Sequence, residues 1–140
     1  MSTDVLTPAD LELLRRPLLG FVTTAGGPVP PQPRPVWFEV TDDGAIQLFT
    51  PPNSPKVRQL RDDPRASFIV AAPADERERW VSVAGPVTVE PDGARELAER
   101  LAARYWDLDD EIRKEDLKGL LDAEYVRLVI RPETVKRVVT

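Results

Sequence analysis

The stretch PRPVWFEVTDDGAIQLFTPPNSPKVRQL, residues 33–60, contains the signals that decide the fold. Two runs of alternating apolar residues, 34–40 and 45–50, lie on either side of the dipeptide Asp43-Gly44. Such a pattern predicts a tight β-hairpin, because glycine accepts the positive φ that a short turn between strands requires. The proline-rich start of the first run places it at a sheet edge or a barrel rim, since proline cannot donate a ladder hydrogen bond.

A helix is expected directly after this hairpin, with Ser54 as N-cap and Pro55 at the first helical position. Its charges oppose the helix dipole, because Lys56 lies in the first turn and Asp62-Asp63 lie in the last. An anion bound at the N-terminus would make this order favourable. The sequence thus predicts a phosphate site formed by free backbone N–H groups, the hydroxyls of Thr50 and Ser54, and Lys56. The alternative is a capped surface helix with an incidental lysine.

Length and composition restrict the chemistry that the chain can perform. With 140 residues, it is expected to form one domain, residues 1–140, that buries its own core. Cysteine and histidine are both absent, which removes disulfides, thiolate nucleophiles, the commonest general base and the commonest metal ligand. An enzyme with this composition must use Asp, Glu, Lys, Tyr, Ser or a bound cofactor.

Charge and hydropathy argue against two classes of partner. The formal net charge of −5 disfavours nucleic acid. No apolar run approaches the roughly 20 residues that cross a bilayer, and the N-terminus lacks the pattern of a secretory signal. We therefore expect a cytoplasmic protein with no membrane partner, and the absence of cysteine is consistent with a reducing compartment.

The rest of the chain reads as alternating strands and helices. Further strands are expected at 18–24, 66–72, 80–90, 125–131 and 134–139, and helices at 7–16, 92–106 and 109–121. The nearly continuous apolar run 66–72 predicts burial on both faces, and Gly85-Pro86 predicts a bulge or bend. Hairpin connections predominate, so we expect a mainly β fold: a six- to seven-stranded antiparallel barrel with helices packed outside.

The order of several short motifs resembles one family. These motifs are Arg34-Pro-Val-Trp-Phe, Leu-Phe-Thr50, Ser54-x-Lys56, Leu60-Arg-Asp-Asp-Pro64-Arg65 and Gly85. In this order and spacing, over about residues 18–90, they resemble the flavin-binding split-barrel proteins related to pyridoxamine-phosphate oxidase. The resemblance implies a split β-barrel that forms a homodimer, with two cofactors bound at the subunit interface.

The resemblance also implies roles for individual residues. The phosphate-contacting positions of the family correspond to Thr50, Ser54 and Lys56, and a basic residue that reaches the same phosphate corresponds to Arg34. The strand whose backbone lines the flavin ring corresponds to Val36 and Trp37. Large aromatic side chains commonly fill cores and interfaces, so Trp80 and Trp106 are expected there or against the flavin of either subunit.

Departures from the family pattern narrow the expected activity. The true oxidases have a longer C-terminal segment with a histidine-containing substrate motif, and this chain has no histidine. Pyridoxamine-phosphate oxidation is therefore not expected. The chain is similar to the short members that use flavin mononucleotide (FMN) or the 8-hydroxy-5-deazaflavin coenzyme, in which the cofactor supplies the redox chemistry.

We therefore expect an oxidoreductase that transfers hydride or electrons to or from a small organic substrate, with FMN as the first choice of cofactor and the deazaflavin as the alternative. A non-enzymatic module that binds flavin or haem remains open. A basic rim of Arg58, Arg61 and Arg65 would suit the acidic tail of the deazaflavin, although Asp62 and Asp63 beside it would cancel much of its charge.

No side chain is assigned a catalytic role. Tyr105 and Tyr125 are interpreted as structural, since their ordinary pKa is near 10. The acidic cluster Asp107, Asp109, Asp110 and Glu111 could suggest a metal, but an N-cap with acidic residues in the first helical turn accounts for it. No metal site is predicted.

Overall fold

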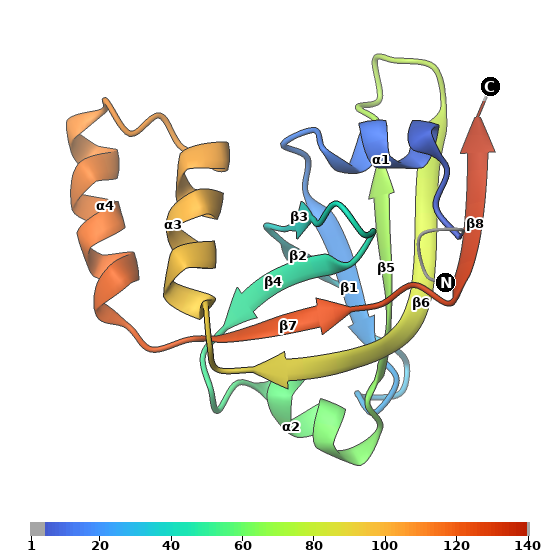
Figure 1. Cartoon of the computed structure of the whole chain (residues 1–140), viewed down its shortest axis with the longest axis horizontal. Helices are drawn as coiled ribbons and strands as arrows, with labels where there is room; N and C mark the ends of the chain where they lie inside the picture. Colours follow the sequence, from blue (N-terminus) through green and yellow to red (C-terminus); the bar gives the residue numbers. More distant parts are fainter. Residues whose placement is uncertain (1–4, 140) are drawn as a thin grey trace.

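The computed structural model describes residues 5–139 (Figure 1). The helices are α1 (Pro8–Leu14), α2 (Pro55–Asp62), α3 (Ala94–Tyr105) and α4 (Glu111–Asp122). The strands are β1 (Gly20–Thr24), β2 (Arg34–Val36), β3 (Glu39–Val40), β4 (Ile46–Thr50), β5 (Arg65–Ala71), β6 (Arg79–Glu90), β7 (Val126–Ile130) and β8 (Thr134–Val139).

These strands form one curled antiparallel sheet. The pairing order is β2-β1-β5-β6-β7-β4-β3, and β8 pairs with β6 outside this path. Its two end strands, β2 and β3, are joined by only Trp37 and Phe38, so the sheet curls back on itself (Figure 1). This arrangement confirms the expected mainly β fold, a split antiparallel barrel with helices outside.

The run 34–40, expected to be a single strand, is two strands. Residues of β2 pair with β1, whereas residues of β3 pair with β4. Phe38, between them, is fully buried in the core and packs edge-on against Phe68 with ring centroids 4.9 Å apart. The break occurs because the chain passes from one half of the barrel to the other at this point. The described residues therefore contain eight strands, where the sequence suggested six or seven.

The expectation that 66–72 is buried on both faces is also wrong. Phe68 and Val70 of β5 face the core, while Ile69 between them is 37% exposed. The reason is that the core covers only the inner face of this part of the sheet. On the outer face, no helix among the described residues covers β5.

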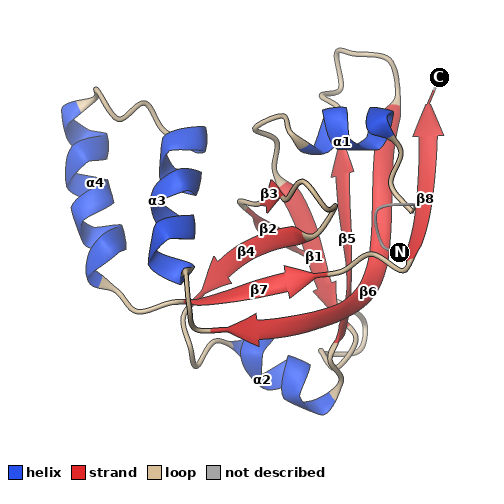
Figure 2. Ribbon diagram, viewed as in Figure 1, coloured by secondary structure: helices blue, strands red, loops and turns tan. Residues whose placement is uncertain are grey.

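Short helices close the two ends of the barrel (Figure 2). Leu13 and Leu14 of α1 enter the core at one end, and Val57 and Leu60 of α2 enter it at the other. Helix α3 packs against β4 and β7, while α4 packs on α3 and buries no residue. None of the helices in the described part of the chain is long and apolar enough to cross a membrane.

Strand β6 serves both halves of the barrel, and it bends where the sequence predicted. It pairs with β5 and β8 before the bend and with β7 after it. At Gly85 the backbone approaches the connection between β7 and β8 so closely that an added Cβ would overlap the carbonyl oxygen of Arg131. The backbone N–H of Arg131 donates to the carbonyl of Pro86 at 3.0 Å. Glycine is required here because nothing larger fits.

Asp10 joins α1 to β8. Its carboxylate is 5% exposed, accepts hydrogen bonds of 2.8–3.1 Å from the guanidinium of Arg137, and closes a capping box with Thr7. Burial raises the pKa of Asp10, but the hydrogen bonds from Arg137 and from the Thr7 backbone outweigh this effect. The pKa therefore lies below its ordinary value of 3.8.

Replacing Gly85 by alanine is expected to lower the free energy of unfolding by about 1–3 kcal/mol, because the new methyl group would displace backbone. Gly119 provides the matched control, since it lies in α4 with open space around it. Gly119→Ala is expected to stabilise by roughly 0.5–1 kcal/mol through helix propensity. Urea unfolding of both variants checks this, and equal effects would contradict the close approach at Gly85.

Asp10→Asn is expected to lower the free energy of unfolding by about 1–3 kcal/mol at pH 7. Because the folded-state pKa lies below the unfolded one, this contribution is complete above the ordinary value of 3.8 and is lost as the pH falls through the folded pKa. Urea unfolding at pH 7 and at about pH 3 should show the two proteins converging. Asp116→Asn, at an exposed ion pair, is the control and should change little.

Candidate functional site

A small cleft lies between β1, β2 and the first turn of α2. Its volume is about 110 Å³, and none of the described residues that line it is acidic. Two cations do, Arg34 from β2 and Lys56 from α2, together with the polar side chains of Thr24, Gln32 and Gln59. The cleft is therefore positively charged by composition.

The start of α2 positions Lys56 in this cleft. The hydroxyl of Ser54 accepts a hydrogen bond from the N–H of Val57 at 3.4 Å and so caps the helix, as predicted. Pro55 has no N–H to satisfy. The backbone N–H of Lys56 has no hydrogen-bond partner within residues 5–139, and the hydroxyl of Ser54 can still donate. Two donors thus remain at the helix start.

The two cations lack counterions. Among the described residues, neither Arg34 nor Lys56 makes an ion pair or a side-chain hydrogen bond. Burial lowers the pKa of Lys56, and the positive charge of Arg34 lowers it further. Lys56 is half-buried and Arg34 is exposed, and their like charges destabilise each other. A bound anion would remove this cost.

The other two phosphate-site candidates, Thr50 and Ser54, are buried and are not part of the cleft lining. Thr50 ends β4 opposite Val126, and Thr50 and Ser54 are 5% and 9% exposed. Neither lines the cleft. The structure therefore brings Arg34 and Lys56 together in the cleft, whereas Thr50, at the end of β4, and Ser54, the N-cap of α2, do not line it.

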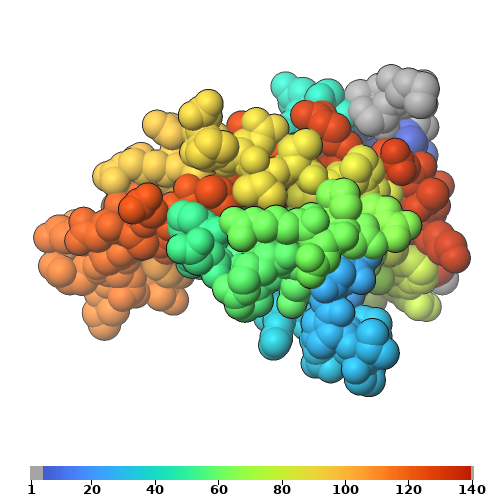
Figure 3. Space-filling model, turned by 90° about the horizontal axis from the view of Figure 1, so that it is seen from below, coloured from blue at the N-terminus to red at the C-terminus, as the bar shows by residue number. Residues whose placement is uncertain are grey.

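A larger groove of about 470 Å³ adjoins this cleft, and Thr24 and Pro28 line both. The hydroxyl of Thr24 donates to the Oε1 of Gln59 at 2.5 Å, which ties β1 to α2 at the boundary. Residues 27–31 form one wall of the groove. In Figure 3, seen from below, the blue segment that leads into β2 projects beside the green helix α2.

The strand positions assigned to the flavin ring lie beyond Arg34. Val36 is half-buried and pairs with Gly20. Trp37 belongs to an aromatic cluster between the barrel and α3. Its ring stacks on that of Tyr105 with centroids 5.2 Å apart and packs edge-on against Trp106 with centroids 4.9 Å apart. The ring centroid of Phe49 lies 6.4 Å from that of Trp37. Trp37 and Trp106 are thus together, on the side of β2 toward α3.

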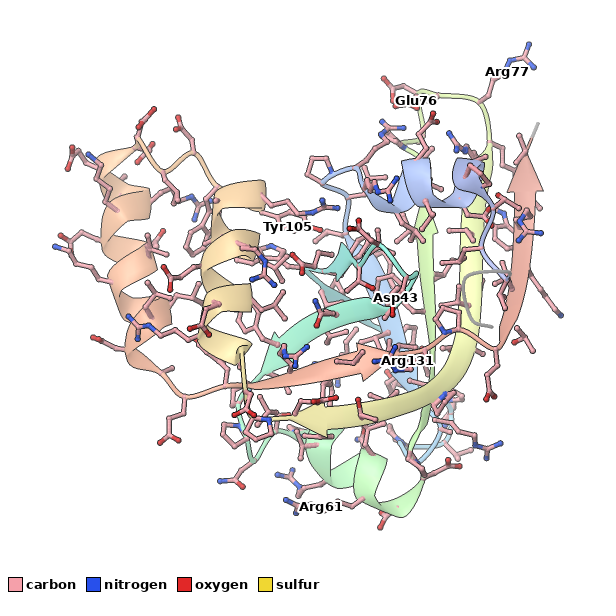
Figure 4. All side chains as sticks on the ribbon, in the orientation of Figure 1. Asp43, Arg61, Glu76, Arg77, Tyr105 and Arg131 are labelled. Carbon is pink, nitrogen blue, oxygen red and sulfur yellow. The ribbon has the colours of Figure 1, made fainter. Side chains whose placement is uncertain are left out.

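Both tyrosines have structural hydrogen bonds, as interpreted from the sequence. The hydroxyl of Tyr105, which points from α3 toward the barrel in Figure 4, donates to the carbonyl of Leu18 at 2.7 Å. The hydroxyl of Tyr125 donates to the carbonyl of Leu120 at 2.7 Å, and burial raises the pKa of Tyr125.

Trp80 lies elsewhere. It is at the start of β6, opposite Ala71 and Val138, whereas the large groove lies at Ala84 and Gly85 farther along the strand. The described chain therefore does not bring Trp80 together with Arg34 and Lys56. A contact between Trp80 and the cofactor of a second subunit stays a prediction.

The sequence reading missed Thr24, Gln32 and Gln59 as cleft residues. Gln59 was detectable, because it lies three residues after Lys56 and so shares its helix face. Thr24 and Gln32 carry no such signal, since the end of a strand and a proline-rich loop take their places only in the folded chain.

The expected basic rim is not part of the cleft. Arg65 is held by Asp63 through two hydrogen bonds of 2.7 and 2.9 Å, and Arg58 donates to the carbonyl of Asn53 at 2.5 Å. By helical periodicity, Arg58 and Arg61 lie on a flank of α2 away from Lys56 and Gln59. Figure 4 places Arg61 at the outer edge of α2.

The acidic cluster acts as predicted. Asp110 is the N-cap of α4 and accepts hydrogen bonds from the N–H groups of Ile112 and Arg113. No group of acidic residues within residues 5–139 is arranged to hold a metal ion.

Solved structures similar to this chain share its fold. The conserved hypothetical protein Rv2991 from Mycobacterium tuberculosis is 23% identical with a TM-score of 0.74, over 95% of this chain and 84% of that one. An F420 reductase is 23% identical with a TM-score of 0.71, over 94% and 98%. A heme binding protein from Mycobacterium smegmatis is 25% identical with a TM-score of 0.61, over 96% and 55%.

Comparison with functionally curated proteins finds no match. The family model described as pyridoxamine 5'-phosphate oxidase matches residues 6–138, nearly the whole chain. This match agrees with the split barrel and with the motif order around Arg34 and Lys56. The chain therefore belongs to the pyridoxamine 5'-phosphate oxidase family.

Proposed function

We propose that this protein is an oxidoreductase that binds a flavin-type cofactor, with FMN as the first choice, and transfers hydride or electrons to or from a small organic substrate. The observation that carries the proposal is the pair of cations Arg34 and Lys56, which share a cleft with no acidic partner. A phosphate monoester carries the negative charge and the acceptor oxygens that this pair lacks.

Each residue of the site has a defined task in this proposal. Arg34 and Lys56 bind the phosphate, and the free N–H of Lys56 and the hydroxyl of Ser54 donate to its oxygens. The backbone at Val36 and Trp37 lines the ring. A bound flavin supplies the redox chemistry, so the protein's tasks are to orient the cofactor and to keep water from one side of it. No side chain is proposed as a general acid or base.

The charge distribution favours FMN over the deazaflavin. The acidic tail of a deazaflavin would need free cations beside the phosphate cleft. Arg65 is neutralised by Asp63, and Arg58 and Arg61 lie on another flank of α2. The F420 reductase among the similar structures keeps the deazaflavin as the alternative.

A binding module without turnover is the second candidate, and its discriminator is catalysis by the cofactor-loaded protein. Within this candidate, flavin is favoured over haem. Haem iron is usually held by histidine, cysteine, methionine or tyrosine. The chain has no histidine or cysteine and one methionine, and the hydroxyls of its two tyrosines donate to backbone carbonyls.

We also propose a homodimer that completes the cofactor site. The outer face of β1 and β5 exposes Leu19, Phe21 and Ile69 to 50%, 41% and 37%, and Phe21 and Ile69 are direct cross-strand partners. Large apolar side chains gathered on one face are typical of a subunit interface. A second copy packed on this face is our proposal for what covers it.

Lys56→Met is expected to weaken FMN binding by at least about tenfold, roughly 1.4 kcal/mol, without destabilising the cofactor-free protein. Stability is expected to be kept because the folded-state pKa of Lys56 is lowered. At a pH below this value the lysine is charged, and its charge destabilises the folded state. Fluorescence titration and urea unfolding at pH 7 measure the two quantities.

Lys118→Met is the matched control, since this lysine is exposed on α4 and should leave FMN affinity unchanged. Equal FMN affinity in wild type and Lys56→Met, or a large loss of stability in Lys56→Met, would mean that Lys56 has a structural role only.

Light scattering is expected to give twice the chain mass for the wild type. Phe21→Asp should yield a folded monomer, because a carboxylate at the centre of the proposed interface cannot be paired there. Val89→Asp is the control, since Val89 has the same 41% exposure but lies outside this face. A monomeric wild type would contradict the proposed dimer.

A further inference from the structure

The 110 Å³ cleft is too small to hold a whole cofactor. Binding sites for drug-sized ligands usually measure about 300–1,000 Å³, so the cleft accommodates a phosphate and little more. The adjoining groove of about 470 Å³ is continuous with it across Thr24 and Pro28. Val36 and Trp37, the positions proposed for the flavin ring, lie on one side of Arg34 and Lys56. The groove opens on the opposite side of these two cations. It therefore lies on the side of the bound phosphate that faces away from the proposed flavin ring.

Short side chains form the floor of this groove. Thr23, Ser67, Ala84 and Thr134 are successive cross-strand partners on β1, β5, β6 and β8, so their short side chains form one row across four strands. With strands about 4.8 Å apart, the row is roughly 14 Å long. Three of its four members carry a hydroxyl group. Thr23 and Ser67 share the outer face of β1 and β5 with Phe21 and Ile69, two residues away, so the groove borders the proposed dimer interface. Such a floor suits a planar heterocycle with polar edges.

The charge of the groove disfavours an anion. Its one lining cation, Arg65, is paired with Asp63 at 2.7 Å, and the carboxylate of Glu133 stands on the rim. A polyanionic tail would meet this carboxylate without a free cation nearby. A neutral group with N–H donors would instead find Glu133 and the three hydroxyls as acceptors.

We propose that this groove is a second subsite, which binds a neutral nucleoside attached to the far side of the phosphate held by Arg34 and Lys56. The proposal rests on the phosphate site of the proposed function, but not on the flavin ring. Nucleotides without a flavin are therefore expected ligands of this protein, and FMN occupies only part of the available site.

Adenosine 5'-monophosphate (AMP) is the smallest probe that spans both cavities, and ribose 5-phosphate is its matched control without the base. Calorimetric titration of the full chain with each, and fluorescence titration with FMN, give three affinities per variant. AMP is expected to bind at least about tenfold more tightly than ribose 5-phosphate.

Thr134→Phe and Ser67→Phe fill the groove from two strands. Each is expected to reduce AMP affinity by about tenfold or more while leaving the affinities for FMN and ribose 5-phosphate unchanged. Thr88→Phe is the control, an exposed threonine on β6 outside the groove. Lys56→Met should weaken all three ligands. Light scattering of each variant separates groove filling from a change of oligomeric state.

Three results would overturn the subsite. The first is that AMP binds no more tightly than ribose 5-phosphate, and the second is that neither filling variant changes the affinity for AMP. The third is that the filling variants weaken FMN binding as much as AMP binding, which would place the flavin ring in the groove. Failure of the proposed function has a different pattern: FMN then does not bind, while AMP still responds to Thr134→Phe and Lys56→Met.

Discussion

The fold depends on one close approach of backbone, at Gly85. Here β6 leaves its pairing with β5 and β8 and begins its pairing with β7, against the carbonyl of Arg131. A single continuous strand therefore belongs to both halves of the barrel. The complementary crossing occurs at Phe38, where the chain changes from β2 to β3. These two corners close the sheet and leave its ends open to be covered by α1 and α2.

The candidate site is a consequence of how α2 closes one of these ends. Val57 and Leu60 are anchored in the core, and Gln59 is tied to Thr24 of β1. Lys56 of this helix lines the same cleft as Arg34 on the edge strand β2. Two like charges thus lie together without a counterion among the described residues. In a folded domain such an arrangement costs stability, and the proposed anion binding would offset this cost.

Local signals were enough to predict most of the elements and two of the residues that line the candidate cleft. The Asp43-Gly44 turn, the Ser54 cap and the motif order led to the barrel and to Lys56, because each depends on neighbours in sequence. The sequence could not show that β5 has one bare face, since that depends on which elements pack elsewhere. Nor could it show that Thr24 and Gln32 line the cleft, because their positions are set by tertiary contacts alone.

The central claim is that Arg34 and Lys56 bind the phosphate of a flavin. Its most direct test compares FMN with riboflavin, which has the same ring and ribityl chain but no phosphate, by fluorescence titration of the wild-type protein at pH 7. We expect FMN to bind at least about tenfold more tightly than riboflavin, since charge-assisted hydrogen bonds contribute roughly 1.5–3 kcal/mol each. Equal affinity for the two flavins would contradict this claim.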